Sequence, residues 1–79
     1  MEIELDEKER LVLKLFLKHS EVCRRHLYPL FPKAVRSTRY QILRKLCDKD
    51  CINLHNHSAA SYYTITELGQ ELLKEITST

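Results

Sequence analysis

The chain has 79 residues, room for one small domain over residues 1–79 and too few for a deep catalytic cavity. Its 43% apolar and 30% charged residues are typical of a soluble globular protein, and its single glycine and two prolines argue against disorder and against tight-turned all-β folds. The net charge of +2 conceals a gradient: residues 1–9 hold five acids and one base, residues 10–49 eleven bases and two acids, and residues 50–79 four acids and one base.

The first predicted helix begins after Asp6. Glu9 follows three residues later, which is the spacing of a capping box. Apolar residues then recur at helical spacing until about His19; they are Leu11, Val12, Leu15 and Phe16. Ahead of this helix, Ile3 and Leu5 alternate with acids and predict a short additional strand.

A second, short helix is predicted from Glu21, with Ser20 as its cap. Pro29 disfavours α geometry at Tyr28, so we expect this helix to end near Leu27 or Tyr28. Its apolar positions are Val22, Cys23, Leu27 and Leu30.

A third helix is predicted over residues 34–49, and it carries two distinct faces. The stripe expected to be buried consists of Val35, Ile42, Leu43 and Leu46. The opposite face is basic and polar and consists of Arg36, Ser37, Tyr40, Gln41, Arg44 and Lys45. No acid stands between Val22 and Cys47, and such local clustering of bases favours a polyanionic partner.

The hydrophobic period then changes from helical to alternating. Residues 51–55 and 62–65 predict two strands around a turn at residues 56–60, with Tyr63 facing the core and Tyr62 facing outward. Thr66 is expected to cap a last helix, which places Leu73 on the outer side. The apolar face of that helix is expected to hold Leu68, Leu72 and Ile76.

Two stretches carry a family likeness, VRSTRYQILRKLCDKDCI and YYTITELGQELL. They resemble the third helix and the segment after the wing in winged helix-turn-helix regulators of the MarR and PadR groups, and in small winged-helix proteins of archaea and their viruses. The likeness covers residues 6–76 and implies a mainly α, α+β fold: a three-helix core, a β-hairpin wing and a C-terminal helix. Asp50 replaces a frequent family glycine, so we expect it to adopt the left-handed conformation.

The predicted function is sequence-specific binding of double-stranded DNA by a small cytoplasmic transcription regulator, with helix 34–49 in the major groove. Residues near the start of this helix are expected to read bases; they are Arg36, Ser37, Arg39, Tyr40 and Gln41. Arg39 lies on the apolar side of the helix and is expected to extend outward, toward DNA or toward an acid. Expected phosphate contacts are Arg24, Arg25, Lys33, Thr38, Arg44 and Lys45. Expected wing contacts are His55, Asn56, His57 and Ser58.

Other classes of protein fit the sequence less well than a DNA-binding regulator. A winged-helix protein-interaction module in a larger assembly is the main alternative, and a homodimer is expected by analogy and from Leu73. No apolar run is long enough to span a membrane, the acidic start is unlike a targeting peptide, and no catalytic constellation, cofactor motif or small-molecule site is evident. The potential zinc ligands Cys47, Cys51, His55 and His57 match no compact zinc module, so no metal is assigned and free, packed thiols are expected, Cys23 included.

Overall fold

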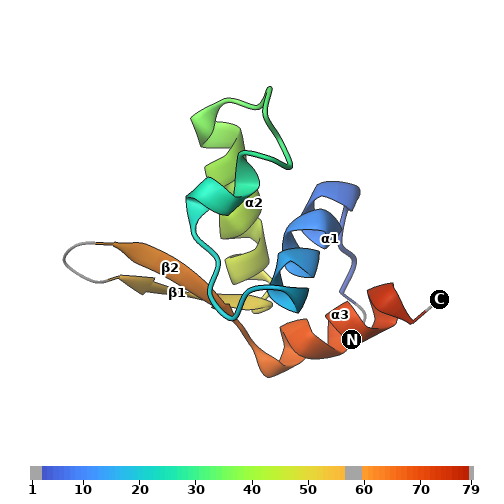
Figure 1. Cartoon of the computed structure of the whole chain (residues 1–79). Coiled ribbons are helices and arrows are strands. Elements are labelled where there is room, and N and C mark those ends of the chain that lie inside the picture. Colours follow the sequence, from blue (N-terminus) through green and yellow to red (C-terminus); the bar gives the residue numbers. More distant parts are fainter. Residues whose placement is uncertain (1–2, 57–59, 79) are drawn as a thin grey trace.

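The computed structural model describes residues 3–56 and 60–78 as a small α+β protein (Figure 1). Three α-helices surround a core against which a two-stranded antiparallel hairpin packs, an arrangement compatible with a winged-helix layout. The elements in chain order are α1 (Glu7–Lys14), the 3₁₀ turns η1 (Leu15–Leu17) and η2 (Arg24–Leu27), α2 (Arg36–Asp48), β1 (Ile52–Asn56), β2 (Ser61–Ile65) and α3 (Glu67–Thr77). In the described ranges, no helix has the length and apolar character needed to cross a membrane.

Helix α1 begins with the predicted capping box. The Glu9 N–H donates to Asp6 Oδ1 at 2.8 Å, and the Asp6 N–H donates to Glu9 Oε1 at 3.0 Å. The backbone N–H of Glu9 also lowers the pKa of the Asp6 carboxyl. The helix is shorter than its apolar pattern suggested, because the chain tightens into η1 after Lys14. Its buried apolar residues are Val12 and Leu13, whereas Leu11 is 37% exposed.

The segment after η1 differs most from the prediction. No helix begins at Glu21; Val22 is instead extended and pairs with Tyr63 of β2, with N···O distances of 2.9 and 2.8 Å in the two directions. Val22 is fully buried, so a β-branched side chain is packed in the extended conformation that suits it. The helical turn is limited to η2. Its start is capped by His26 Nδ1, which accepts a hydrogen bond from the backbone N–H of Cys23 at 2.8 Å, and not by Ser20 as expected.

The additional strand expected around Ile3 and Leu5 is not formed; these residues run as irregular chain into α1. Lys49 Nζ donates to the backbone oxygen of Glu4 at 2.9 Å, which ties this segment to the end of α2. The edge of β2 beside Tyr63, where a further strand would add to the hairpin, is taken by Val22.

Helix α2 lies within the predicted bounds, and Ile42, Leu43 and Leu46 are buried as expected. Val35 was expected in the same stripe and is 63% exposed. The reason is its backbone: with φ −75° and ψ 160°, Val35 is the extended N-cap residue, so the angular spacing of the helix does not apply to it.

The hairpin and the last helix agree with the predicted pattern, with one correction. Strand β1 pairs with β2 so that Leu54 faces Tyr63 across the ladder, and Tyr63 is 6% exposed. Asp50 has a φ of 62°, the expected left-handed conformation. Leu73, expected on the outer side of α3, is buried at 7% exposure, because α3 packs across the bottom of the core near α1 (Figure 1).

Gly69 explains how closely α3 approaches the chain at the start of the hairpin. A Cβ at this position would overlap the carbonyl oxygen of Cys51 and would lie 2.7 Å from Ile65 Cγ1. The Thr66 hydroxyl accepts from the Gly69 N–H at 3.0 Å and so caps α3, as predicted. The core beside this contact consists of Val12, Leu13, Val22, Leu27, Ile42, Leu43, Leu46, Cys51, Ile52, Tyr63 and Leu73.

Candidate nucleic-acid interface

The exposed face of α2 borders a groove of about 660 Å³, which we call the α2 groove. Its walls are Arg24, Val35, Arg36, Ser37, Tyr40, Gln41 and Arg44. Four of the five residues predicted to read bases therefore lie together on one surface, and Arg44 lies beside them. All four are exposed, Tyr40 to 42%. Guanidinium, amide and hydroxyl groups on one helix face are the groups that can hydrogen-bond to base edges.

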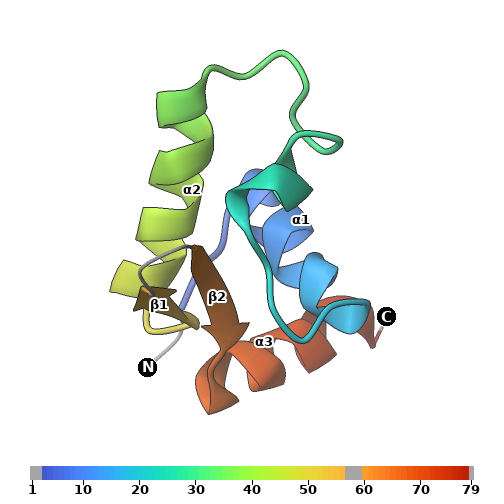
Figure 2. The ribbon, with the colours of Figure 1, turned by 60° about the vertical axis from the view of Figure 1, so that its left-hand side comes forward.

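A second groove, of about 270 Å³, lies between η2, the start of α2 and the start of β2, and we call it the arginine groove. It is lined by Cys23, Arg24, Arg25, Tyr28, Arg36, Arg39, Ala60 and Ser61. Arg24 and Arg36 line both grooves, so the two form one continuous basic surface. Figure 2 shows α2 and the segment around η2 side by side above the hairpin.

The positive charge of this surface is not neutralised within the described parts of the chain. Among the described residues, the ion pair formed is that of Lys49 with Glu9, which line neither groove. No carboxylate of the described residues pairs with the exposed arginines, which are Arg24, Arg25, Arg36 and Arg44. Helix α2 also begins without an acid in its first turn and without a side-chain cap, which leaves the positive end of its dipole open beside Arg36 and Ser37. The grooves are therefore suited to an anionic partner.

Arg39, predicted to extend outward, turns back onto its own connection. Its Nη1 donates to the backbone oxygen of Phe31 at 3.1 Å and also to that of Ala34, and its guanidinium carbon lies 4.3 Å from the centre of the Tyr28 ring. The side chain thus links α2 to the turn between η2 and α2 and remains in the wall of the arginine groove. Sequence spacing placed Arg39 between the two faces of the helix and gave no signal for these carbonyl partners.

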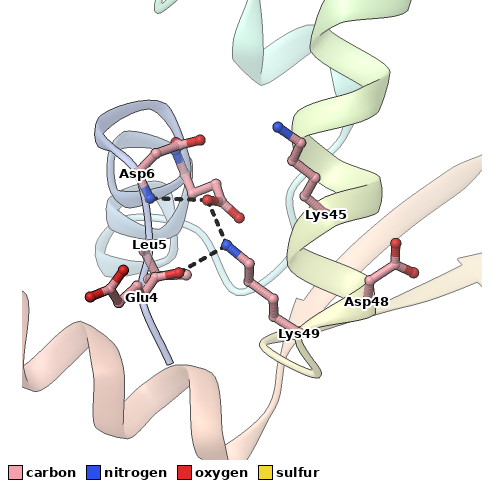
Figure 3. Close-up of a pocket in the computed structure, with 7 residues that line it drawn as sticks. Glu4, Leu5, Asp6, Lys45, Asp48 and Lys49 are labelled. Atoms are coloured by element: carbon pink, nitrogen blue, oxygen red, sulfur yellow. Dashed lines mark hydrogen bonds and ion pairs between the residues drawn. The ribbon is translucent and has the colours of Figure 1, made fainter. Parts of the chain in front are cut away.

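Three predicted phosphate contacts lie outside the two grooves. Lys33 is exposed in the connection before α2, and Thr38 is partly buried in the first turn of α2. Lys45 lies on another side of α2, where it borders a pocket of about 520 Å³ with Glu4, Leu5, Asp6, Glu9, Asp48 and Lys49 (Figure 3). The Lys45 charge also contributes to the lowered pKa of Asp6, so this lysine has an acid in its neighbourhood.

Glu9 in that pocket is a buried acid that the sequence did not reveal as such. Its side chain is 2% exposed, and Oε1 accepts from Lys49 Nζ at 2.8 Å as well as from the Asp6 N–H. Its second oxygen, Oε2, is buried and has no hydrogen-bond partner among the described residues. The capping-box spacing predicted Glu9 at the start of a helix, but only the fold brings Lys49, forty residues further on, to the same carboxylate.

The hairpin carries a partly buried aromatic pair and contributes no lysine or arginine from its described residues. The rings of His55 and Tyr62 stack with centres 4.9 Å apart and planes 9° apart, and His55 Nε2 lies 2.8 Å from Thr64 Oγ1. Ser61 Oγ donates to Asn56 Oδ1 at 2.7 Å. Of the predicted wing contacts, His57 and Ser58 lie outside the described residues. Ala60 and Ser61, which sequence reasoning did not single out, border the arginine groove.

The three cysteines are free thiols in the structure. Cys51 is fully buried as a small apolar side chain, and burial raises the pKa of both the Cys47 and Cys51 thiols. Within the described part of the chain, no group of three or more histidine, cysteine, aspartate or glutamate side chains is arranged to hold a metal ion. Comparisons of the chain with protein-family models, with curated proteins and with solved structures find no match.

Proposed function

We propose that this protein is a winged-helix DNA-binding protein, a small transcription regulator that inserts α2 into the major groove of double-stranded DNA. The single observation that carries this proposal is the α2 groove, where Arg36, Ser37, Tyr40 and Gln41 are exposed together beside arginines that form no ion pair with any described residue. An α-helix fits the width of the major groove, and side chains near its N-terminus are the ones that reach base edges in this geometry.

The roles of individual residues follow from their positions along α2. Arg36 at the first turn can donate two hydrogen bonds to guanine, and Gln41 can pair with both edge groups of adenine. Arg44 lies two turns further along and Arg24 comes from η2, so both are placed to meet phosphates at the borders of the groove. Arg25 belongs to the same basic surface. Lys33, exposed outside the two grooves, would meet a flanking phosphate, and the wing residues His55 and Asn56 would follow the neighbouring backbone.

A protein-interaction module is the second candidate, and exposed apolar side chains favour it. Leu54 on β1 is 43% exposed and Leu17 in η1 is 60% exposed. A homodimer stays a proposal. Leu73, from which it was predicted, is buried, so the exposed Leu17 is the better candidate for a contact between two copies.

The proposal is tested by two variants with the same loss of charge. Arg36→Gln lies in the α2 groove, whereas Lys14→Gln lies in the exposed last turn of α1. Fluorescence anisotropy with a labelled duplex should show binding weakened about tenfold or more by Arg36→Gln and by less than about twofold by Lys14→Gln. Equal effects of the two variants would mean that net charge, and not α2, governs binding.

A further inference from the structure

The arginine groove concentrates positive charge to a degree that the fold alone does not require. Arg24, Arg25, Arg36 and Arg39 line one groove of about 270 Å³, and the described residues place no carboxylate there. Guanidinium groups held close to one another repel, and an anion between them would remove this cost. The folded protein is therefore expected to be more stable with an anion bound in this groove than without one.

Arg39 gives this groove a fixed donor. Its Nη1 is held by the Phe31 and Ala34 carbonyls and its guanidinium plane is held over Tyr28. A guanidinium has five N–H donors, and within the described residues these bonds engage only those of Nη1. The remaining donors belong to a group that is already immobilised, so a bound anion would cost little additional side-chain entropy.

We propose that the arginine groove is a binding site for one phosphate group, with Arg39 as its preorganised donor and Arg24, Arg25 and Arg36 as exposed donors around it. The planar fork of arginine matches the oxygens of phosphate, and several arginines can approach a tetrahedral anion from different sides. The inference changes Arg39 from a base-reading residue to a phosphate-binding one. It rests on the proposed function only for the source of the phosphate, which is either the DNA backbone or the free anion.

The site itself is tested without DNA. The ¹⁵N-labelled full chain is titrated with inorganic phosphate at constant ionic strength, with chloride as the exchanged anion, and NMR spectra are recorded. Saturable shifts are expected at the Nε–Hε signals of Arg36 and Arg39 and at the backbone amides of Tyr28 and Ser61, which line the groove. A linear, unsaturated drift of these signals, or shifts of the same size over the whole surface, would overturn the site.

Two exposed arginines provide a matched pair of variants. Arg25 lines the arginine groove only, and Arg44 lines the α2 groove only, so Arg25→Gln and Arg44→Gln remove the same charge at different places. Loss of one charge-assisted hydrogen bond should weaken phosphate binding about tenfold in Arg25→Gln. Arg44→Gln should change it by less than about twofold. Equal weakening in both would show a diffuse charge effect and would overturn the site.

Arg39→Lys tests the preorganised donor. The charge is kept, but the planar fork and its hold on Phe31 and Ala34 are lost. Phosphate affinity should fall about tenfold in a variant that still unfolds cooperatively. Unchanged affinity would refute the role given to Arg39, and the Arg25→Gln and Arg44→Gln pair keeps the site testable should the lysine variant fail to fold.

The source of the phosphate is settled with labelled duplex DNA in the anisotropy assay. If the groove holds a backbone phosphate, inorganic phosphate should weaken DNA binding more than chloride does at equal ionic strength, and this difference should vanish in Arg25→Gln. If phosphate binds the groove without affecting DNA binding, the free anion is its ligand. Absence of DNA binding together with saturable phosphate binding would refute the proposed function and leave the site standing.

Discussion

The guanidinium carbon of Arg39 lies 4.3 Å from the centre of the Tyr28 ring, and this contact joins α2 to the segment that follows η2. Because the same side chain also donates to the carbonyls of Phe31 and Ala34, one residue connects both ends of the turn between the two elements. The position of Arg24 and Arg25 relative to the face of α2 depends on that turn. Arg39 therefore helps to set the geometry of the whole basic surface.

Replacing Arg39 by alanine should destabilise the protein by about 2 kcal/mol, because it removes hydrogen bonds from a charged donor to two backbone carbonyls. Urea unfolding followed by circular dichroism measures this. A double-mutant cycle with Tyr28→Leu should give a coupling of about 0.5–1 kcal/mol, the usual range for a partly exposed cation–π contact. The control is Arg36→Ala, which removes an exposed arginine of the same helix and should change the free energy of unfolding by no more than about 0.5 kcal/mol. A similar loss in Arg39→Ala and Arg36→Ala would contradict the structural role given to Arg39.

Lys49→Met should destabilise the protein by about 2–3 kcal/mol, since it leaves the Glu9 carboxylate buried without its cationic partner. The Lys49 side chain is itself 33% exposed, and water can partly replace it, which is why we expect less than for a fully buried pair. Lys45→Met on the same helix is the control: Lys45 is exposed, and its loss should cost no more than about 0.5 kcal/mol. Chemical denaturation of the two variants side by side decides the matter, and equal stabilities would show that Glu9 does not need Lys49.

Stability should decrease in acid partly through Asp6. The Glu9 N–H and neighbouring lysines lower the pKa of this carboxyl in the folded state below its ordinary value of 3.8. The stabilising contribution is therefore complete above about pH 4 to 5 and is lost as the pH falls through the folded-state pKa. Asp6→Asn keeps a capping side chain but cannot titrate, so its free energy of unfolding should depend less steeply on pH below about pH 4. Identical pH profiles for the two proteins would rule out the contribution.

Two residues of the α2 groove should respond differently to the DNA sequence. Gln41→Ala should cost about 1–3 kcal/mol on the preferred duplex and little on random DNA, because an amide that pairs with a base edge carries sequence information. Arg44→Ala should weaken binding to every duplex by a similar factor and lower the salt slope by about 0.9, as expected for one phosphate contact. Selection of a preferred site from random duplexes, followed by anisotropy, provides both measurements. A uniform loss from Gln41→Ala would remove it from the base-reading residues.

Local sequence signals predicted the elements that local interactions determine. The capping box at Asp6 and Glu9, the bounds of α2, the hairpin strands and the left-handed Asp50 all depend on residues close together in the chain. The exposed face of α2, apart from Lys45, also followed from its angular pattern. These features required only spacing, capping chemistry and the preference of each residue type.

Contacts between distant segments account for what the sequence did not reveal. Val22 forms a bridge rather than a helix because Tyr63, forty-one residues later, supplies its hydrogen-bond partners. Leu73 is buried because α3 packs beneath α1, and Glu9 is buried because Lys49 reaches it. The arginine groove likewise depends on the turn that Arg39 fixes, and its wall at Ala60 and Ser61 comes from the hairpin.

The salt dependence of duplex binding tests the central claim most directly. With one phosphate held in the arginine groove by Arg24 and Arg25 and another met by Arg44, the logarithm of affinity should fall against the logarithm of salt concentration with a slope of about −1.8 or steeper. The measurement is a fluorescence-anisotropy titration of the full chain with labelled duplex at several sodium chloride concentrations. Absence of binding at low salt, or an affinity that does not change with salt, would contradict DNA binding through this surface.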